Sequence, residues 1–169
     1  MQAVLNPILK FRLWRHGRGF GIHSPFAYRF VTEVLNQPNG YYAYQILREP
    51  LRRLIFRVAL DLCGPRCAVY ADRGFIAPVR LARRDVKFVE KNPDFIVLDG
   101  RHASADEQRQ VAESILSGAT AFIFHSRAFK QLEYVRKRLE NGMVFDNHRG
   151  VVIVVPRAKL PKMSFDVKF

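Results

Sequence analysis

The chain has 169 residues, the usual length of one domain, and 49% of them are apolar, which excludes an intrinsically disordered protein. No apolar run approaches the roughly 20 residues of a membrane-spanning helix. Lys10, Arg12 and Arg15 interrupt the apolar stretch near the N-terminus, and no small-residue cleavage site follows it. Neither a membrane span nor a signal peptide is therefore predicted, and the expected location is the cytoplasm.

The charge of the chain is strongly basic, at +13 from 28 Lys and Arg against 15 Asp and Glu. Such a charge attracts polyanions through the release of counterions. No recognised nucleic-acid-binding motif accompanies it, so the prediction is weak, sequence-independent binding, and a basic surface without a specific partner is the alternative. The residues predicted to contact nucleic acid are Arg52, Arg53, Arg57, Arg83, Arg84 and Lys87.

The two cysteines, Cys63 and Cys67, do not predict a metal site. Their C-x3-C spacing has no second pair, and the five histidines are scattered along the chain. Two free thiols in a reducing compartment are expected.

The first third of the chain predicts helices. Residues 1–22 are expected to form an arm that packs on the domain, because their apolar residues do not form one clean stripe. Ser24 and Pro25 are typical of a helix start, and the breakers of residues 36–40 end that helix. A short helix over 41–48 and an amphipathic helix over 51–62 follow.

After Gly64 the pattern changes to short apolar runs separated by amphipathic helices. Ser104 and Glu107 form a capping box before the helix that ends at Gly118, and a further helix is expected over 129–142. This alternation predicts an α/β domain with a mostly parallel sheet of about five to seven strands, covered on both faces, and an antiparallel strand pair at its C-terminal edge. The predicted strands are 67–71, 86–89, 95–98, 121–124, 143–145, 151–155 and 165–169.

Several motifs resemble a family of bacterial class I S-adenosylmethionine (SAM)-dependent methyltransferases. H-G at 16–17 and G-I-H-S-P-F at 21–26 resemble the family's H-G-x-H-S-P-F opening, and "FIVLDGRH" at 95–102 resembles its fourth strand and D-G-x-H turn. Y-Y-A-Y at 41–44, L-I-F-R at 54–57 and the tail from Val151 resemble further elements. The resemblance implies a shortened Rossmann-like methyltransferase fold in a single domain, residues 1–169. Its helical segment is 1–63 and its truncated sheet 64–169.

The same resemblance implies that the SAM-binding residues are largely missing. The family's E-x-G-x-x-x-G turn would place Glu at Tyr70 and its first Gly at Asp72, which cannot allow a close ligand approach as Gly does. Asp72 and Gly74 are the candidate cofactor residues, although Gly74 is more typical of a turn. The interval between Gly74 and Phe95 is too short for two strand–helix units of roughly 30 residues each. The second strand and its ribose-binding carboxylate are therefore expected to be absent.

The ends of the later strands supply the candidate catalytic residues. The family's fifth strand ends in Asp-Asp, a pair suited to Mg²⁺. This chain has His125 and Ser126 in place of that pair, so no metal is expected. Asp99, His102 and His125 can be combined into a proton-transfer cluster. The alternative is that Asp99 is a turn residue and that His102 satisfies a local backbone group.

Three functions remain open from the sequence. The favoured one is a catalytically degenerate methyltransferase-like protein, a pseudoenzyme that acts as a binding or regulatory module for an unknown protein or polyanion and has no cofactor. The second is an active SAM-dependent methyltransferase with a divergent pocket, and the third is a basic nucleic-acid-binding module. A shortened sheet leaves edges that need cover, so a homo-oligomer is also considered.

Overall fold

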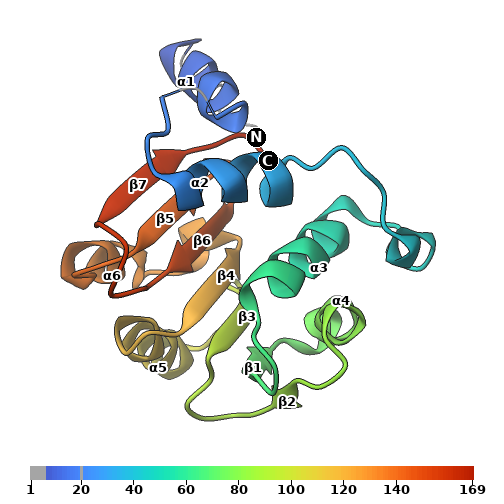
Figure 1. Cartoon of the computed structure of the whole chain (residues 1–169). Helices are drawn as coiled ribbons and strands as arrows, with labels where there is room; N and C mark the ends of the chain where they lie inside the picture. Colours follow the sequence, from blue (N-terminus) through green and yellow to red (C-terminus); the bar gives the residue numbers. More distant parts are fainter. Residues whose placement is uncertain (1–6, 20) are drawn as a thin grey trace.

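Seven strands form one sheet in the order β2-β1-β3-β4-β6-β5-β7 (Figure 1). The computed structural model describes residues 7–19 and 21–169. The strands are β1 (Ala68–Ala71), β2 (Lys87–Phe88), β3 (Phe95–Asp99), β4 (Thr120–Phe124), β5 (Met143–Asp146), β6 (Val151–Val155) and β7 (Met163–Asp166). The helices are α1 (Pro7–Gly17), α2 (Pro25–Arg29), α3 (Pro50–Leu62), α4 (Ile76–Ala82), α5 (Ala105–Leu116) and α6 (Leu132–Arg138). Short turns of other helix types are η1 (Phe30–Leu35), η2 (Tyr42–Gln45), η3 (Arg73–Phe75) and η4 (Ser126–Ala128).

The sheet is mostly parallel, as predicted, and β6 is its antiparallel strand. β2, β1, β3 and β4 pair in parallel, whereas β6 runs against both β4 and β5. β7 then pairs in parallel with β5. The antiparallel strand is therefore inside the sheet, and the predicted antiparallel pair does not form its edge. Both edge strands are short, which limits the backbone that is open to pairing with another chain.

Helices cover both faces of the sheet (Figure 1). One core lies under α2, η1, α3 and α4, and the other lies under α5 and α6. The alternation along β3 shows how one strand serves both cores: Phe95 and Val97 enter the first, and Ile96 and Leu98 enter the second. A strand buried on both faces needs an unbroken apolar run, which is the pattern the sequence has there.

The helix starts are those that the sequence predicts. The Ser24 hydroxyl accepts a hydrogen bond from the N–H of Ala27 at 3.4 Å, and Pro25 is the first residue of α2. Ser104 and Glu107 form a complete capping box, with both hydrogen bonds at 3.2 Å. Such caps satisfy backbone donors that the first turn of a helix leaves free.

The interval between β1 and β3 holds one short helix, α4, and the two-residue strand β2. The prediction that residues 75–94 do not contain two complete strand–helix units is confirmed. One part of that expectation was wrong, however. β2 pairs directly with β1, Ala68 opposite Lys87, so a strand does occupy the position beside β1, and Glu90 follows its end. The interval is long enough for a minimal strand because α4 has only seven residues.

The N-terminal arm is helical and lies against the domain. Leu13 of α1 is buried, and its carbonyl accepts a hydrogen bond from the N–H of Lys168 at 3.2 Å, beside β7. Residues 1–6 of the predicted arm lie outside the described residues. Three other elements differ from their expected ranges. The helices expected over 41–48 and 129–142 are shorter, as η2 and α6, and the strand expected over 165–169 lies at Met163–Asp166, as β7. In residues 7–19 and 21–169, each helix is too short or too polar to cross a bilayer.

Candidate functional site

The carboxyl ends of β1, β3 and β4 bring together most of the predicted site residues. Ligands of open α/β sheets bind outside such strand ends. Asp72 follows β1, Asp99 ends β3, and His125 follows β4. Because these strands are parallel neighbours in the order β1-β3-β4, residues far apart in the sequence meet at one edge.

Asp72 ties two of these strand ends together. Its Oδ2 accepts a hydrogen bond from the backbone N–H of Asp99 at 2.6 Å, and its own N–H donates to the carbonyl of Val97 at 3.1 Å. Burial raises the pKa of Asp72 above its usual value, and the hydrogen bond from Asp99 offsets this only in part. The side chain is therefore engaged with the sheet itself.

Asp99 is the centre of the charged cluster. Its side chain is 8% exposed, and burial alone raises its pKa, but the hydrogen bonds from Arg101 and His125 outweigh this and hold the pKa below its usual value. The contacts are Arg101 N to Oδ1 at 3.0 Å, Arg101 Nη2 to Oδ2 at 3.1 Å, and His125 Nδ1 to Oδ1 at 2.9 Å. His102 is more distant, with Nε2 3.8 Å from Oδ2 and a side chain 75% exposed.

The backbone around His125 is constrained. Its φ is +47°, in the left-handed region that is uncommon for residues other than Gly, although Asn, Asp and His adopt it more often than the rest. Gly100 packs under it: a Cβ at Gly100 would lie 3.0 Å from the carbonyl oxygen of His125 and 3.0 Å from the N of Phe129. The glycine of the D-G-R-H turn thus allows the loop after β4 to approach β3 closely.

This cluster orients an imidazole beside a carboxylate, which is the geometry that a proton-transfer pair requires. Asp99, His102 and His125 therefore lie close together, as predicted, although His102 is more distant from Asp99 than His125 is. Arg101 was not predicted as a member of this cluster. Its place in the D-G-R-H turn, two residues after Asp99, is the feature of the sequence that could have indicated it. No group of three or more His, Cys, Asp or Glu side chains in the described part of the chain is arranged to hold a metal ion.

Gly74, the other candidate cofactor residue, lies in η3 without a left-handed φ. A Cβ built on it meets no atom within 4 Å. Neither a tight turn nor a close approach of protein atoms requires a glycine there. Gly74 thus lies in a turn, the role that the sequence favours for it, but this turn does not depend on a glycine.

The predicted nucleic-acid contacts divide into two groups. Three guanidinium groups bind backbone carbonyl oxygens: Arg53 that of Leu47 (2.6 Å), Arg57 those of Val34 (2.6 Å) and Leu35 (2.9 Å), and Arg83 that of Leu60 (3.1 Å). Arg52 pairs with Glu49 at 3.2 Å, whereas Arg84 and Lys87 are exposed. The first three are engaged in holding the fold, so the basic residues of this surface are not equally available to a partner.

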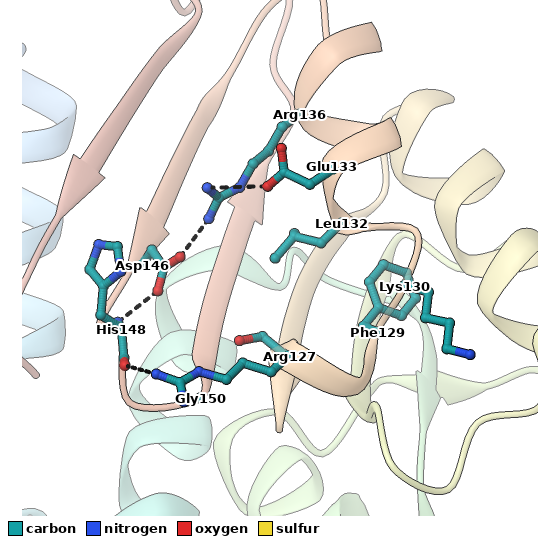
Figure 2. Close-up of a pocket in the computed structure, with 10 residues that line it drawn as sticks. Arg127, Phe129, Lys130, Leu132, Glu133, Arg136, Asp146, His148 and Gly150 are labelled. Carbon is teal, nitrogen blue, oxygen red and sulfur yellow. Dashed lines mark hydrogen bonds and ion pairs between the residues drawn. The ribbon is translucent and has the colours of Figure 1, made fainter. Parts of the chain in front are cut away.

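Two cavities open near the same edge of the sheet. One, of about 600 Å³, lies on the α3 side and is lined by Leu51, Leu54, Phe124, Asn147 and Phe169 among others. The other, of about 440 Å³, lies between α6 and the turn that joins β5 to β6 (Figure 2). Asp72, Gly74 and Asp99 line neither cavity.

The charges in the second cavity largely satisfy one another. Figure 2 shows Arg136 reaching towards Asp146 and Glu133, and Arg127 donating to the carbonyl of His148. The guanidinium groups are thereby occupied within the protein. This cavity is lined by few groups that remain open to an anionic ligand.

Comparison of the chain with protein-family models, with curated proteins and with solved structures finds no match in any of the three.

Proposed function

We propose that this chain is a catalytically degenerate, methyltransferase-like protein that acts as a binding module and not as a SAM-dependent enzyme. The observation that carries the proposal is the 2.6 Å hydrogen bond between the Asp72 carboxylate and the N–H of Asp99. In nucleotide-binding α/β folds, the turn after the first strand must let a ligand approach the backbone. Here a side chain bridges β1 and β3 at that point.

The residues around this turn support the same conclusion. Asp72 is followed by Arg73 in place of a small residue. Asp99 is already paired with Arg101 and His125, so most of the hydrogen-bonding capacity of its carboxylate is used within the protein. The resemblance to the bacterial methyltransferase family carries the family assignment, and we expect the protein to act in the cytoplasm.

The active-methyltransferase alternative is favoured by one observation. Glu90 follows β2, the strand beside β1, where a carboxylate can reach the ribose of a bound nucleotide. Glu90 also lies close enough to Tyr70 to help raise the pKa of that phenol, after the larger effects of burial and of Glu107. A carboxylate is therefore present near the end of β1.

Isothermal titration with SAM, and with its demethylated product, tests the proposal. We expect no binding at micromolar ligand, because the turn after β1 lacks the open backbone that the cofactor needs. A low-micromolar dissociation constant for either ligand would overturn the proposal and establish the alternative. In that case Glu90→Ala should abolish binding, whereas Glu113→Ala, a change of equal charge on the exposed side of α5, should not.

A binding module with a charge of +13 has a polyanion as its expected partner. Nucleic acid is the proposed class, because its phosphate backbone is the kind of polyanion that a chain of this charge attracts. The strength of this second proposal depends on whether a structured site accompanies the charge.

A further inference from the structure

A cavity of about 240 Å³ joins three segments that are far apart in the sequence: α1, the turn between β5 and β6, and the residues after β7. The C-terminal residues lie beside the end of the sheet near α1 (Figure 1). Lys168 holds this arrangement through the hydrogen bond from its N–H to the carbonyl of Leu13. The cavity is therefore a product of the tertiary fold.

The cavity combines cations with aromatic rings. Its lining includes Lys10, Arg149 and Lys168, together with the rings of Trp14 and Phe169, and none of the side chains that line it is acidic. The three cationic side chains form no ion pair with the rest of the described chain. Like charges gathered without a counter-charge repel one another, so an anion bound among them is stabilised.

Asn147 adds a directed donor to this cavity. It is 6% exposed, and its Oδ1 accepts hydrogen bonds from the N–H groups of Arg149 at 2.8 Å and Val151 at 2.9 Å. These bonds fix the amide so that Oδ1 faces the turn. Its Nδ2 has no acceptor within the part of the chain described, and the residue lines the cavity, so it can donate to a ligand oxygen.

The neighbouring surface of α1 extends the same chemistry. Trp14 is 43% and Phe11 57% exposed, and their rings stack with centroids 6.1 Å apart. A guanidinium group lies over each ring: Arg15 is 5.7 Å from the centroid of Phe11, and Arg18 is 4.6 Å from that of Trp14. Aromatic and cationic groups are thus interleaved on one surface.

The interleaving of cations and rings distinguishes between two kinds of anionic partner, a membrane surface and a single-stranded nucleic acid. A helix that lies on a membrane presents its apolar face to the lipid and its basic face to the headgroups and water, so the two kinds of residue are opposed. In α1 the cations cover the exposed rings, and the buried Leu13 packs on the protein instead. Single-stranded nucleic acid needs the mixed pattern, because its bases stack on aromatic rings while its phosphates bind cations.

We propose that the cavity between α1 and the C-terminal segment binds single-stranded nucleic acid. A base stacks on Trp14 in place of the Arg18 guanidinium, and the adjacent phosphate is held by Lys10, Arg149 and Lys168. Asn147 and Phe169 also line the 600 Å³ cavity, so the two cavities adjoin at these two residues. This inference rests on the proposed role as a binding module. It assigns that role a ligand and moves the nucleic-acid site away from α3 and α4.

The test is binding of a short labelled oligothymidylate, followed by fluorescence anisotropy and by the emission of Trp14, the single tryptophan of the chain. We expect quenching of that emission and an affinity that falls with salt. The variant K10A/R149A/K168A should bind about tenfold more weakly and show a salt slope smaller by about 0.7, the contribution of one neutralised phosphate of a single strand.

The matched control is R84A/K87A/K91A, which removes the same types of side chain, one Arg and two Lys, from exposed positions near β2. It should change the affinity less than about threefold. Equal loss in the two triple variants would show that only bulk charge matters and would overturn the site. Circular dichroism and thermal melting must show that both variants are folded; if the first is not, Trp14→Leu, expected to weaken binding by about tenfold, replaces it.

Four further ligands identify the partner class. If a duplex or a strand without bases binds as tightly as oligothymidylate, the proposed stacking of a base on Trp14 is wrong. If a mononucleotide binds as tightly, the proposal that the ligand is a strand is wrong. Binding to phosphatidylserine vesicles without binding to oligothymidylate would identify a membrane partner instead. SAM titration reports separately on the turn at Asp72, so a failure there leaves the result at Trp14 interpretable.

Discussion

Nδ1 of His125 lies 2.9 Å from Oδ1 of Asp99, and this contact joins the end of β4 to the end of β3. The Arg101 guanidinium donates to both oxygens of the same carboxylate. The negative charge of Asp99 is therefore shared between two partners inside the protein. These contacts also hold the ends of the neighbouring strands β3 and β4 together.

The ionised form of Asp99 should stabilise the fold, and the variant Asp99→Asn should remove this dependence on pH. The pKa of Asp99 is lower in the folded chain than its unfolded value of about 3.9. The stabilisation is complete above that unfolded pKa and is lost as the pH falls through the lower folded pKa. Denaturant unfolding at a series of acidic pH values should give a shallower curve for Asp99→Asn than for the wild type. Parallel curves would contradict the assignment.

Replacement of His125 tests its left-handed backbone. His125→Asn keeps a side chain that tolerates a φ of +47°, so we expect a modest loss of stability. His125→Val loses the Asp99 contact and adds strain for a β-branched residue, and should cost about 2 kcal/mol. Chemical denaturation measures the difference between the two variants. A valine variant as stable as the asparagine variant would show that the backbone there is unstrained.

Arg57→Ala should destabilise the fold without weakening oligonucleotide binding. The Arg57 guanidinium donates to the carbonyls of Val34 and Leu35 and to the hydroxyl of Tyr44. Hydrogen bonds from a charged donor contribute about 1.5–3 kcal/mol each, and buried acceptors would be left unpaired. Arg52→Ala is the control of equal charge, because its ion pair with Glu49 is exposed and should contribute under about 1 kcal/mol. Thermal melts and anisotropy titrations of both variants check this prediction.

The sequence predicted the class of fold because its signals there are local. The continuous apolar run of β3 and the capping box at Ser104 each specify one element, and both elements form as expected. The parallel pairing of β7 with β5 was not predictable in this way, since it depends on where the chain turns after Pro156. The cavity at Trp14 likewise arises from segments that only the tertiary fold brings together.

Two glycines near the strand ends should respond oppositely to alanine. At Gly100 an added Cβ lies 3.0 Å from backbone atoms of His125 and Phe129, which cannot move aside as a flexible side chain can. Gly100→Ala should therefore cost about 1–3 kcal/mol through forced displacement of the loop after β4. At Gly74 the added Cβ meets no atom within 4 Å, and the backbone has no left-handed φ.

Gly74→Ala should therefore be neutral or stabilise the protein by up to about 1 kcal/mol, because alanine restricts the unfolded chain. The Gly74→Ala variant also tests whether the turn after β1 binds SAM. If Gly74 were kept for close approach of SAM, the alanine variant would lose a SAM affinity that the wild type has. We expect instead that neither protein binds SAM in a titration, and that only Gly100→Ala lowers the denaturation midpoint.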